Sequence, residues 1–398
     1  MAYGGKMGTL EVLNVGQGDS IILNPSKGCT YDTIKFLIDL GPGQYDVTQH
    51  IGDKEKVHVF ITHHDMDHLD GFRYFVNKMH LIEEITIPFY QNEITLIAQS
   101  ILNLKGINTS KDCKEFIDGL NQIVNNQIFL KTLIKGYRST PKLSFAYDGR
   151  RICNHIECLN PPVSMETYDW LEEAVEKDFR MLFHEVFDEK FARELDIYIR
   201  ANKNNHSVVD SQELLRIFLW ENDEEQYDGM NRIKANYVVS FFMENSSLFR
   251  AFNSKPTRKN LEKIYNNFVK CTHDACIVLR VTYDGKSFLL TGDASKKVFN
   301  RLIREGKDIS ANYLKMPHHG SKYNMNKKIL KEIAPEAVII SHKNGHFGKS
   351  SDPHPNREIL QMLHEENIKV FITNDVIKEG VVCMKKEAHK GDFYVQIL

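Results

Sequence analysis

The chain has 398 residues with 42% hydrophobic and 26% charged side chains, which is an ordinary composition for a soluble globular protein. It is too long for one ordinary compact core, and its formal net charge of −2 means that any contact with nucleic acid must come from a local patch. Seven cysteines without a Cys-x-x-Cys pair argue against a zinc ribbon and a disulfide framework, and no apolar run approaches the roughly 20 residues of a membrane helix, so we expect a reduced, cytoplasmic protein.

The first predicted elements are two strands at residues 9–15 and 20–23. The turn between them contains Gly16, Gly18 and Asp19, and a Gly-x-Gly pair is typical of a hairpin whose backbone needs positive φ. The next strand, residues 34–38, is followed by Asp39. An aspartate in this position either caps a turn or belongs to a functional site.

The stretch from Thr62 to Gly71 follows a buried strand at residues 57–61 and is dense in potential metal ligands. These are His63, His64, Asp65, Asp67 and His68. Packing them together without compensation would cost about 2–7 kcal/mol per buried polar group. A chain that leaves a strand and turns into a helix can aim alternate residues at one point, so we expect a metal ion there. The expected ligands are His63, Asp65, Asp67 and His68, and the alternative is a surface turn rich in His and Asp.

Residues 72–79 are predicted to be helical, residues 82–88 to form a strand, and residues 91–138 to form amphipathic helices. Strands are expected again at 143–147 and 152–159. Residues 163–272 have helical periodicity, are acidic at first and carry mostly Lys and Arg from about 229 onward, so we interpret them as a helical insertion with a basic end. Residues 202–213 have EF-hand spacing but lack its glycine, which favours a plain helix-loop-helix.

Two further strands, at residues 274–283 and 286–291, form a predicted hairpin that leads to Asp293. Asp293 either caps the following helix or faces a site at the strand end. His318 and His319 follow the next strand. Because side chains alternate along a strand, we expect only one of the two to bind metal and select His318, with His319 as the alternative ligand or a substrate contact.

The last part of the chain is predicted to contain a strand at 336–340, a polar loop, a helix at 357–366 and a strand at 369–373. A helix N-terminus beside a polar loop favours an anionic group. The residues expected around that group are Lys343, Asn344, Lys349, Ser350 and His354. The alternative is an ordinary loop guided by its prolines.

These motifs resemble the metallo-β-lactamase fold and in particular the soluble hydrolase domain of ComEC-type DNA-uptake proteins. The run from His63 to His68 resembles the His-x-His-x-Asp-His signature of the fold, with Asp65 in place of the second His, and the segments 15–20 and 314–321 resemble further ComEC-type motifs. The resemblance implies an α/β (α+β) fold, a four-layer αββα sandwich. Its core would consist of residues 1–162 and 273–398, with 163–272 as the insertion.

The resemblance also implies roles for single residues. Asp39 would support the ligand histidines from behind, and Asp293 would bridge two metals. The third histidine of the family pattern has no clear counterpart, and neither His155 nor His273 is selected. We expect one firm metal at Asp67, His68 and Asp293 and a weaker one at His63, Asp65 and Asp293. The oxygen-rich ligand set favours Mn²⁺, with Zn²⁺ as the alternative.

The expected activity is metal-assisted hydrolysis, in which Asp67 orients the attacking water and Lys322, His354 or His319 neutralises the charge that develops. The residues expected to bind substrate are Ser321, Lys322, Lys343, Asn344 and His354. The leading interpretation is a phosphodiesterase or nuclease acting on nucleic acid or a nucleotide derivative. One alternative is a hydrolase of carboxylic esters, lactones or phosphocholine-type esters. Another is a metal-bearing binding or regulatory module whose insertion binds a protein partner; no membrane contact is expected.

Overall fold

The computed structural model describes residues 9–25, 33–88, 102, 114–135, 141–162, 259, 262, 272–283, 285–343, 347–349, 351–373 and 393–396. The chain divides into two compact units, of which the first consists of Met1–Pro88, Tyr137–Pro161 and His273–Leu398. The second consists of Phe89–Gly136 and Pro162–Thr272, and its main described element is helix α3 (Lys114–Lys135). Almost all of the predicted insertion at 163–272, including the EF-hand-like stretch, lies outside the described residues, so that interpretation stays a prediction.

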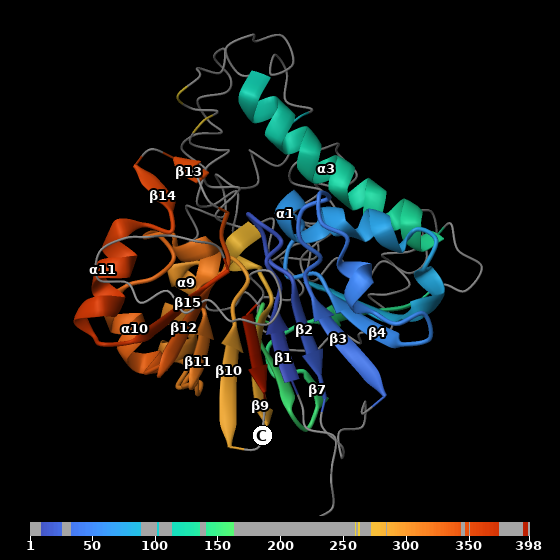
Figure 1. The fold of residues 1–398 in the computed structure, drawn as a ribbon. Coiled ribbons are helices and arrows are strands. Elements are labelled where there is room, and N and C mark those ends of the chain that lie inside the picture. Colours follow the sequence, from blue (N-terminus) through green and yellow to red (C-terminus); the bar gives the residue numbers. More distant parts are fainter. Residues whose placement is uncertain are drawn as a thin grey trace, which may run out of the picture. The chain divides into compact units, whose positions relative to one another are not determined.

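The first unit contains a seven-stranded sheet in the order β16-β1-β2-β3-β4-β5-β6 (Figure 1). Its strands are β1 (Thr9–Val12), β2 (Ile21–Asn24), β3 (Ile34–Ile38), β4 (Lys56–Phe60), β5 (Ile82–Pro88), β6 (Lys142–Ala146) and β16 (Phe393–Gln396). Strands β16 to β3 are antiparallel to their neighbours, whereas β3 to β6 are parallel. The carboxyl ends of the parallel strands β3 to β6 therefore lie at one edge of the sheet, and the loops that follow these strands meet there.

A second seven-stranded sheet has the order β15-β12-β11-β10-β9-β8-β7. Its strands are β7 (Arg151–Cys153), β8 (Ile156–Asn160), β9 (Val278–Tyr283), β10 (Lys286–Leu290), β11 (Tyr313–Lys315), β12 (Ala337–Ile340) and β15 (Lys369–Ile372). It repeats the mixed plan of the first sheet, because β10 to β15 are parallel and β7 to β10 antiparallel. Strands β13 (Phe347–Lys349) and β14 (Asp352–His354) form a separate hairpin.

Two hydrophobic cores hold the second sheet. One lies between the sheets and joins Phe36 and Phe60 of the first to Leu279 and Leu290 of the second. The other joins the opposite face of the second sheet to helices α9 (Lys296–Arg304), α10 (Lys327–Ile333) and α11 (Arg357–Glu365), which Figure 1 shows on that side. The alternation of apolar residues along the strands supplies a face to each core. The prediction of a mixed α/β fold is confirmed at this level.

Several predicted boundaries are wrong. The helix expected at 72–79 is instead a short helix α1 (Met66–Leu69) followed by two 3-10 helices, η2 (Asp70–Phe75) and η3 (Met79–Leu81). The tight turn is set by Gly71, because a Cβ there would overlap the carbonyl oxygen of Leu40. Among the described residues, no helix has both the length and the apolar character needed to cross a membrane.

Candidate metal centre

Asp39, the residue that follows β3, holds the loop after β4 in place by hydrogen bonds. Its backbone is left-handed, with φ of 58°, and its carboxylate is buried. Oδ1 accepts a hydrogen bond from the Thr62 amide at 2.7 Å, and Oδ2 accepts one from the Thr62 hydroxyl at 2.7 Å. Oδ2 also lies 2.7 Å from Nδ1 of His68, so the Nδ1–H donates to Asp39 and the lone pair of His68 is on Nε2.

His63 and His273 form one side of the centre with Asp65 and Asp293. Nε2 of His63 lies 3.5 Å from Oδ2 of Asp65 and 3.7 Å from Oδ2 of Asp293. Nε2 of His273 lies 3.8 Å from the same oxygen of Asp65 and 4.0 Å from that of Asp293. The strand predicted from residue 274 begins only at Val278, and His273 occupies a short helical turn before it. Four ligand-type atoms thus face one another.

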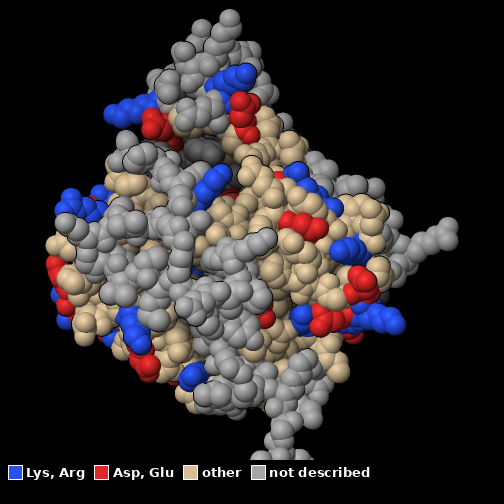
Figure 2. All heavy atoms as spheres, in the orientation of Figure 1, with Lys and Arg blue, Asp and Glu red and all other residues tan. Residues whose placement is uncertain are grey.

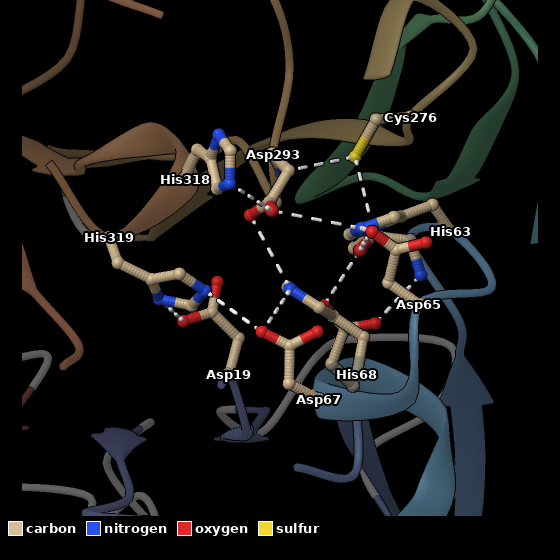
Figure 3. A network of polar contacts seen from close by, with 12 residues as sticks. Asp19, His63, Asp65, Asp67, His68, Cys276, Asp293, His318 and His319 are labelled. Atoms are coloured by element: carbon tan, nitrogen blue, oxygen red, sulfur yellow. Dashed lines mark hydrogen bonds and ion pairs between the residues drawn. The ribbon is translucent and has the colours of Figure 1, made fainter. Parts of the chain in front are cut away.

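The other side of the centre is made by Asp67, His68 and His319, again with Asp293. Nε2 of His68 lies 3.4 Å from Oδ1 of Asp293 and 4.0 Å from Oδ2 of Asp67. Nε2 of His319 lies 3.2 Å from Oδ2 of Asp67. Asp293 therefore offers one oxygen to each side, and Figure 3 shows its carboxylate among the imidazoles of His63, His68 and His318.

His318 and His319 are both turned toward the centre, contrary to the strand alternation expected for them. Strand β11 ends at Lys315, and the two histidines lie in the 3-10 turn η7 (Pro317–Gly320) with φ of 47° and 53°. Consecutive left-handed residues place both rings on one side, with Nε2 of His318 lying 3.7 Å from Oδ2 of Asp293. Such backbone strain is often retained at functional sites. Each histidine belongs to a group that could hold an ion, so the choice between them stays open.

The hydrogen bonds of the rings identify which nitrogen faces the carboxylates. The Thr62 hydroxyl, already a donor to Asp39, accepts from Nδ1 of His63 at 3.1 Å. The carbonyl of Ser341 accepts from Nδ1 of His319 at 3.0 Å. With His68 bound to Asp39, the three rings all direct an Nε2 lone pair at carboxylate oxygens. Two acceptors cannot bond each other, so this arrangement requires a cation or added protons between them.

The spacing of the atoms fits a metal ion. Ligand atoms about 2.1 Å from a tetrahedral ion lie about 3.4 Å apart, close to the separations seen here. Among the described residues, four of these buried atoms have no hydrogen-bond partner: Nε2 of His63, His68 and His273 and Oδ1 of Asp293. Buried polar atoms without partners are rare in folded proteins and point to an absent ligand. The His and Asp residues can therefore hold a divalent ion.

The electrostatics of the centre agree with that fit. Burial alone would lower the pKa of His68, but Asp39, Asp293 and Asp67 raise it well above its ordinary value. Burial would raise the pKa of Asp293, yet the imidazoles of His318 and His68 hold it well below its usual range. The carboxylates thus draw positive charge into the space between the rings. Burial lowers the pKa of His318 itself to about 4, so its ring is neutral at pH 7.

Solvent reaches the centre from one side. The side chains of Asp65 and Asp67 are 36% and 33% exposed and that of His318 is 27% exposed, whereas His63, His68 and Asp293 are almost fully buried. A molecule from solvent can approach the centre along this partly exposed side. The ring of His354, from β14, lies 4.7 Å from that of His318, which brings a further imidazole to this approach.

Other residues predicted for the site lie around it in different roles. Ser321 donates to Asp352 at 2.6 Å, and the amino group of Lys322 pairs with Glu358 of α11 at 2.9 Å. Lys343 is exposed beside the turn at Gly16. Asn344 and Ser350 lie outside the described residues, as does the side chain of Lys349. The roles predicted for these residues stay predictions.

Three residues were missed or not selected from the sequence. Spacing in the sequence does not distinguish His273 from His155, but in the structure His155 is half-buried and its ring bonds the carbonyl of Thr282 at the far end of β9. Cys276 is buried with Sγ 3.8 Å from Nδ1 of His63 and accepts from the Asp293 amide. Lys315 is fully buried in β11 and pairs with Asp19. A lysine within an otherwise apolar strand is the signal that could have indicated a buried partner.

Comparison with known proteins gives a limited result. No family model matches the chain. A segment of 124 residues is 29% identical to ComE operon protein 3 of Bacillus subtilis (strain 168). The segment amounts to 31% of this chain and only 15% of that protein. This weak, partial similarity supports the resemblance to ComEC-type proteins over that segment.

Proposed function

We propose that this chain is a metal-dependent hydrolase of the four-layer metallo-β-lactamase type that cleaves phosphodiester bonds in nucleic acid or a nucleotide derivative. One observation carries the proposal: imidazoles and carboxylates from both sheets converge on one space, in which Nε2 of His63, His68 and His273 and Oδ1 of Asp293 have no hydrogen-bond partner among the described residues. The four-layer arrangement rests on the two stacked sheets and on α9 to α11, and it requires a second helical layer on the first sheet.

The ligand atoms divide into two sets that share Asp293. One set is His63, Asp65, His273 and Asp293, and the other is Asp67, His68, His319 and Asp293. Three of these residues are carboxylates, which favours a harder ion such as Mn²⁺ over an ion held by imidazoles alone, with Zn²⁺ as the alternative. When bound, a divalent ion at this centre supplies Lewis acidity and a water of lowered pKa.

The residues of the chain have distinct parts in the proposed reaction. Asp67 combines a place in the centre with an exposed side chain, so its carboxylate can accept a proton from a water and orient it toward substrate. Asp39 fixes the orientation of the His68 ring, because its carboxylate accepts a hydrogen bond from Nδ1–H, on the side of the ring that faces away from the centre. His354 lies beside His318 next to the partly exposed side, where an N–H group of its ring can donate to a substrate oxygen.

The choice of substrate rests on the resemblance to ComEC-type DNA-uptake proteins and on the buried imidazole of His354 beside the partly exposed His318. On the face that Figure 2 shows, acidic and basic side chains of the described residues are interspersed, without a large patch of either sign. Together with the net charge of −2, this favours a substrate held mainly at the centre over a long duplex bound along a basic surface. The basic end of the predicted insertion lies outside the described residues.

The test is a substrate panel with the purified chain, stripped of metal and reloaded with Mn²⁺ or Zn²⁺. The panel contains single- and double-stranded DNA, RNA, bis(p-nitrophenyl) phosphate, a p-nitrophenyl ester and a lactone. We expect turnover of phosphodiesters that Asp67→Ala lowers by about a hundredfold or more, because it removes the group that accepts the proton of the attacking water. Asp53→Ala, which removes an exposed carboxylate outside the centre, is the control.

Two results would contradict the proposal. Turnover confined to the ester or lactone would keep the enzyme but replace the substrate class. Stoichiometric metal without turnover of any substrate, with Asp67→Ala indistinguishable from the unaltered chain, would favour a binding or regulatory module.

A further inference from the structure

Beside the candidate metal centre, Lys315 and Asp19 form an ion pair that is buried on both sides. Lys315 is the last residue of β11 in the second sheet, and Asp19 lies in the turn between β1 and β2 of the first. Nζ of Lys315 is 2.7 Å from Oδ2 of Asp19, and the two side chains are 0% and 2% exposed. The same amino group donates to the carbonyl of Met316 at 3.2 Å. The pair therefore links the two sheets through the interior.

A buried ion pair is a weak source of stability. Removing two charges from water costs free energy that their attraction only partly returns, and well-packed apolar residues often serve a fold equally well. Lys315 lies in a strand whose neighbours are apolar, where Leu or Met would pack without that cost. The presence of a lysine at this position is therefore better explained by an effect on the neighbouring residues of the metal centre than by an effect on stability.

Asp19 lies against two residues on one side of the centre, Asp67 and His319. Its amide donates to the carbonyl of Asp67 at 3.3 Å. Its Oδ1, which has no hydrogen-bond partner among the described residues, lies 3.8 Å from Nδ1 of His319. Figure 3 shows the two side chains next to each other. The turn is pressed closely onto Asp67, because a Cβ on Gly18 would overlap the Asp67 carbonyl oxygen.

Lys315 touches the same side from the second sheet. It precedes His319 by one short turn, and its carbonyl accepts from the hydroxyl of Thr291 at 2.6 Å, which ties it to the loop that carries Asp293. Nε2 of His319 in turn lies 3.2 Å from Asp67. By contrast, no contact of the pair with His63, Asp65 or His273 is found among the described residues.

We propose that Lys315 and Asp19 are positioning residues that hold His319 and Asp67 together across the two sheets, and so set the metal affinity of that side of the centre alone. Lys315 neutralises Asp19, so the buried turn that carries Asp19 can pack against the backbone of Asp67 and the ring of His319 without adding a free negative charge. The inference rests on the metal centre of the proposed function. It predicts that the metal affinity of one side of the centre depends on the Lys315–Asp19 pair and that the affinity of the other side does not.

The test is a Mn²⁺ titration of the full chain, read by the electron paramagnetic resonance of free Mn²⁺ and by calorimetry. The variants are Lys315→Met, Asp19→Asn and the double variant, in which both charges are replaced by groups of similar shape. Arg301→Met is the matched control. Arg301 also forms a buried ion pair, with Asp148 at 3.0 Å, and it does not touch the centre.

The unaltered chain is expected to bind two ions. In Lys315→Met and in the double variant, one of the two affinities falls about 10- to 100-fold and the other is retained. Arg301→Met lowers the melting temperature but leaves both affinities unchanged. The double variant melts at a higher temperature than Lys315→Met, because no unpaired buried carboxylate remains, and it therefore decides the question if Lys315→Met does not fold.

Two outcomes would overturn the inference while leaving the proposed function intact: both affinities unchanged in the double variant, or both lowered equally. An unaltered chain that binds no Mn²⁺ would instead contradict the manganese centre of the proposed function. The three results are distinguishable in the same titration.

Discussion

Replacing Asp39 by Asn removes the anchor of His68 with almost no change in shape. Oδ1 of Asp39 accepts from the Thr62 amide, and Oδ2 accepts from both the Thr62 hydroxyl and Nδ1 of His68. The new amide nitrogen would face the last two donors. Loss of the hydrogen bond between a charged carboxylate and a buried imidazole should cost about 1.5–3 kcal/mol of folding free energy. Turning the His68 lone pair onto Nδ1 should weaken metal binding about 10- to 100-fold.

Asp46 provides a matched control for this substitution. It also accepts hydrogen bonds from the amide and hydroxyl of one threonine, Thr48, but both go to Oδ1, at 2.9 and 2.6 Å. The amide oxygen of Asn can keep both bonds, so Asp46→Asn should leave stability and metal affinity close to those of the unaltered chain. The assay is a Mn²⁺ titration together with chemical denaturation of each variant. If Asp39→Asn binds Mn²⁺ as tightly as Asp46→Asn, the orientation of His68 by Asp39 has no part in metal binding.

Two further predictions concern other histidines. Burial lowers the pKa of His58 from 6.5 to about 4. As the pH falls below 6.5, this histidine is therefore protonated in the unfolded chain before it is protonated in the folded chain. The folded state keeps its full stability above pH 6.5 and loses about 3 kcal/mol by pH 4. In denaturation experiments at several pH values, the stability of His58→Gln should fall less steeply with decreasing pH than that of the control His80→Gln, which changes an exposed histidine. Equal slopes in the two variants would contradict this prediction. His273→Ala should reduce the Mn²⁺ stoichiometry from two to one, whereas His155→Ala should not, and equal stoichiometry in both would refute the role of His273.

The parts of the centre that could be predicted are those that follow parallel strands directly. Asp39 after β3, the cluster after β4 and Asp293 after β10 lie at strand ends, and the carboxyl ends of parallel strands meet at one edge. Apolar alternation over residues 336–340 and 369–373 likewise indicated strands of the second sheet, and β12 and β15 form within these ranges. Local pattern was sufficient wherever strand and ligand are adjacent in sequence.

The parts that could not be predicted depend on backbone conformation or on distant contacts. His318 and His319 both approach the centre because they are left-handed, which no alternation rule expresses. His273 is separated from β8 by more than a hundred residues, so spacing gave no reason to prefer it to His155. Lys315 is explained only by Asp19, which lies in the other sheet.

Anomalous diffraction from crystals grown with Mn²⁺, collected at the manganese edge, tests the shared cation most directly. The account predicts a peak about 2.0–2.3 Å from a carboxylate oxygen of Asp293 and from Nε2 of His63 or His68. Anomalous peaks confined to other parts of the chain, with these imidazoles and Asp293 bonded only to one another or to water, would contradict it.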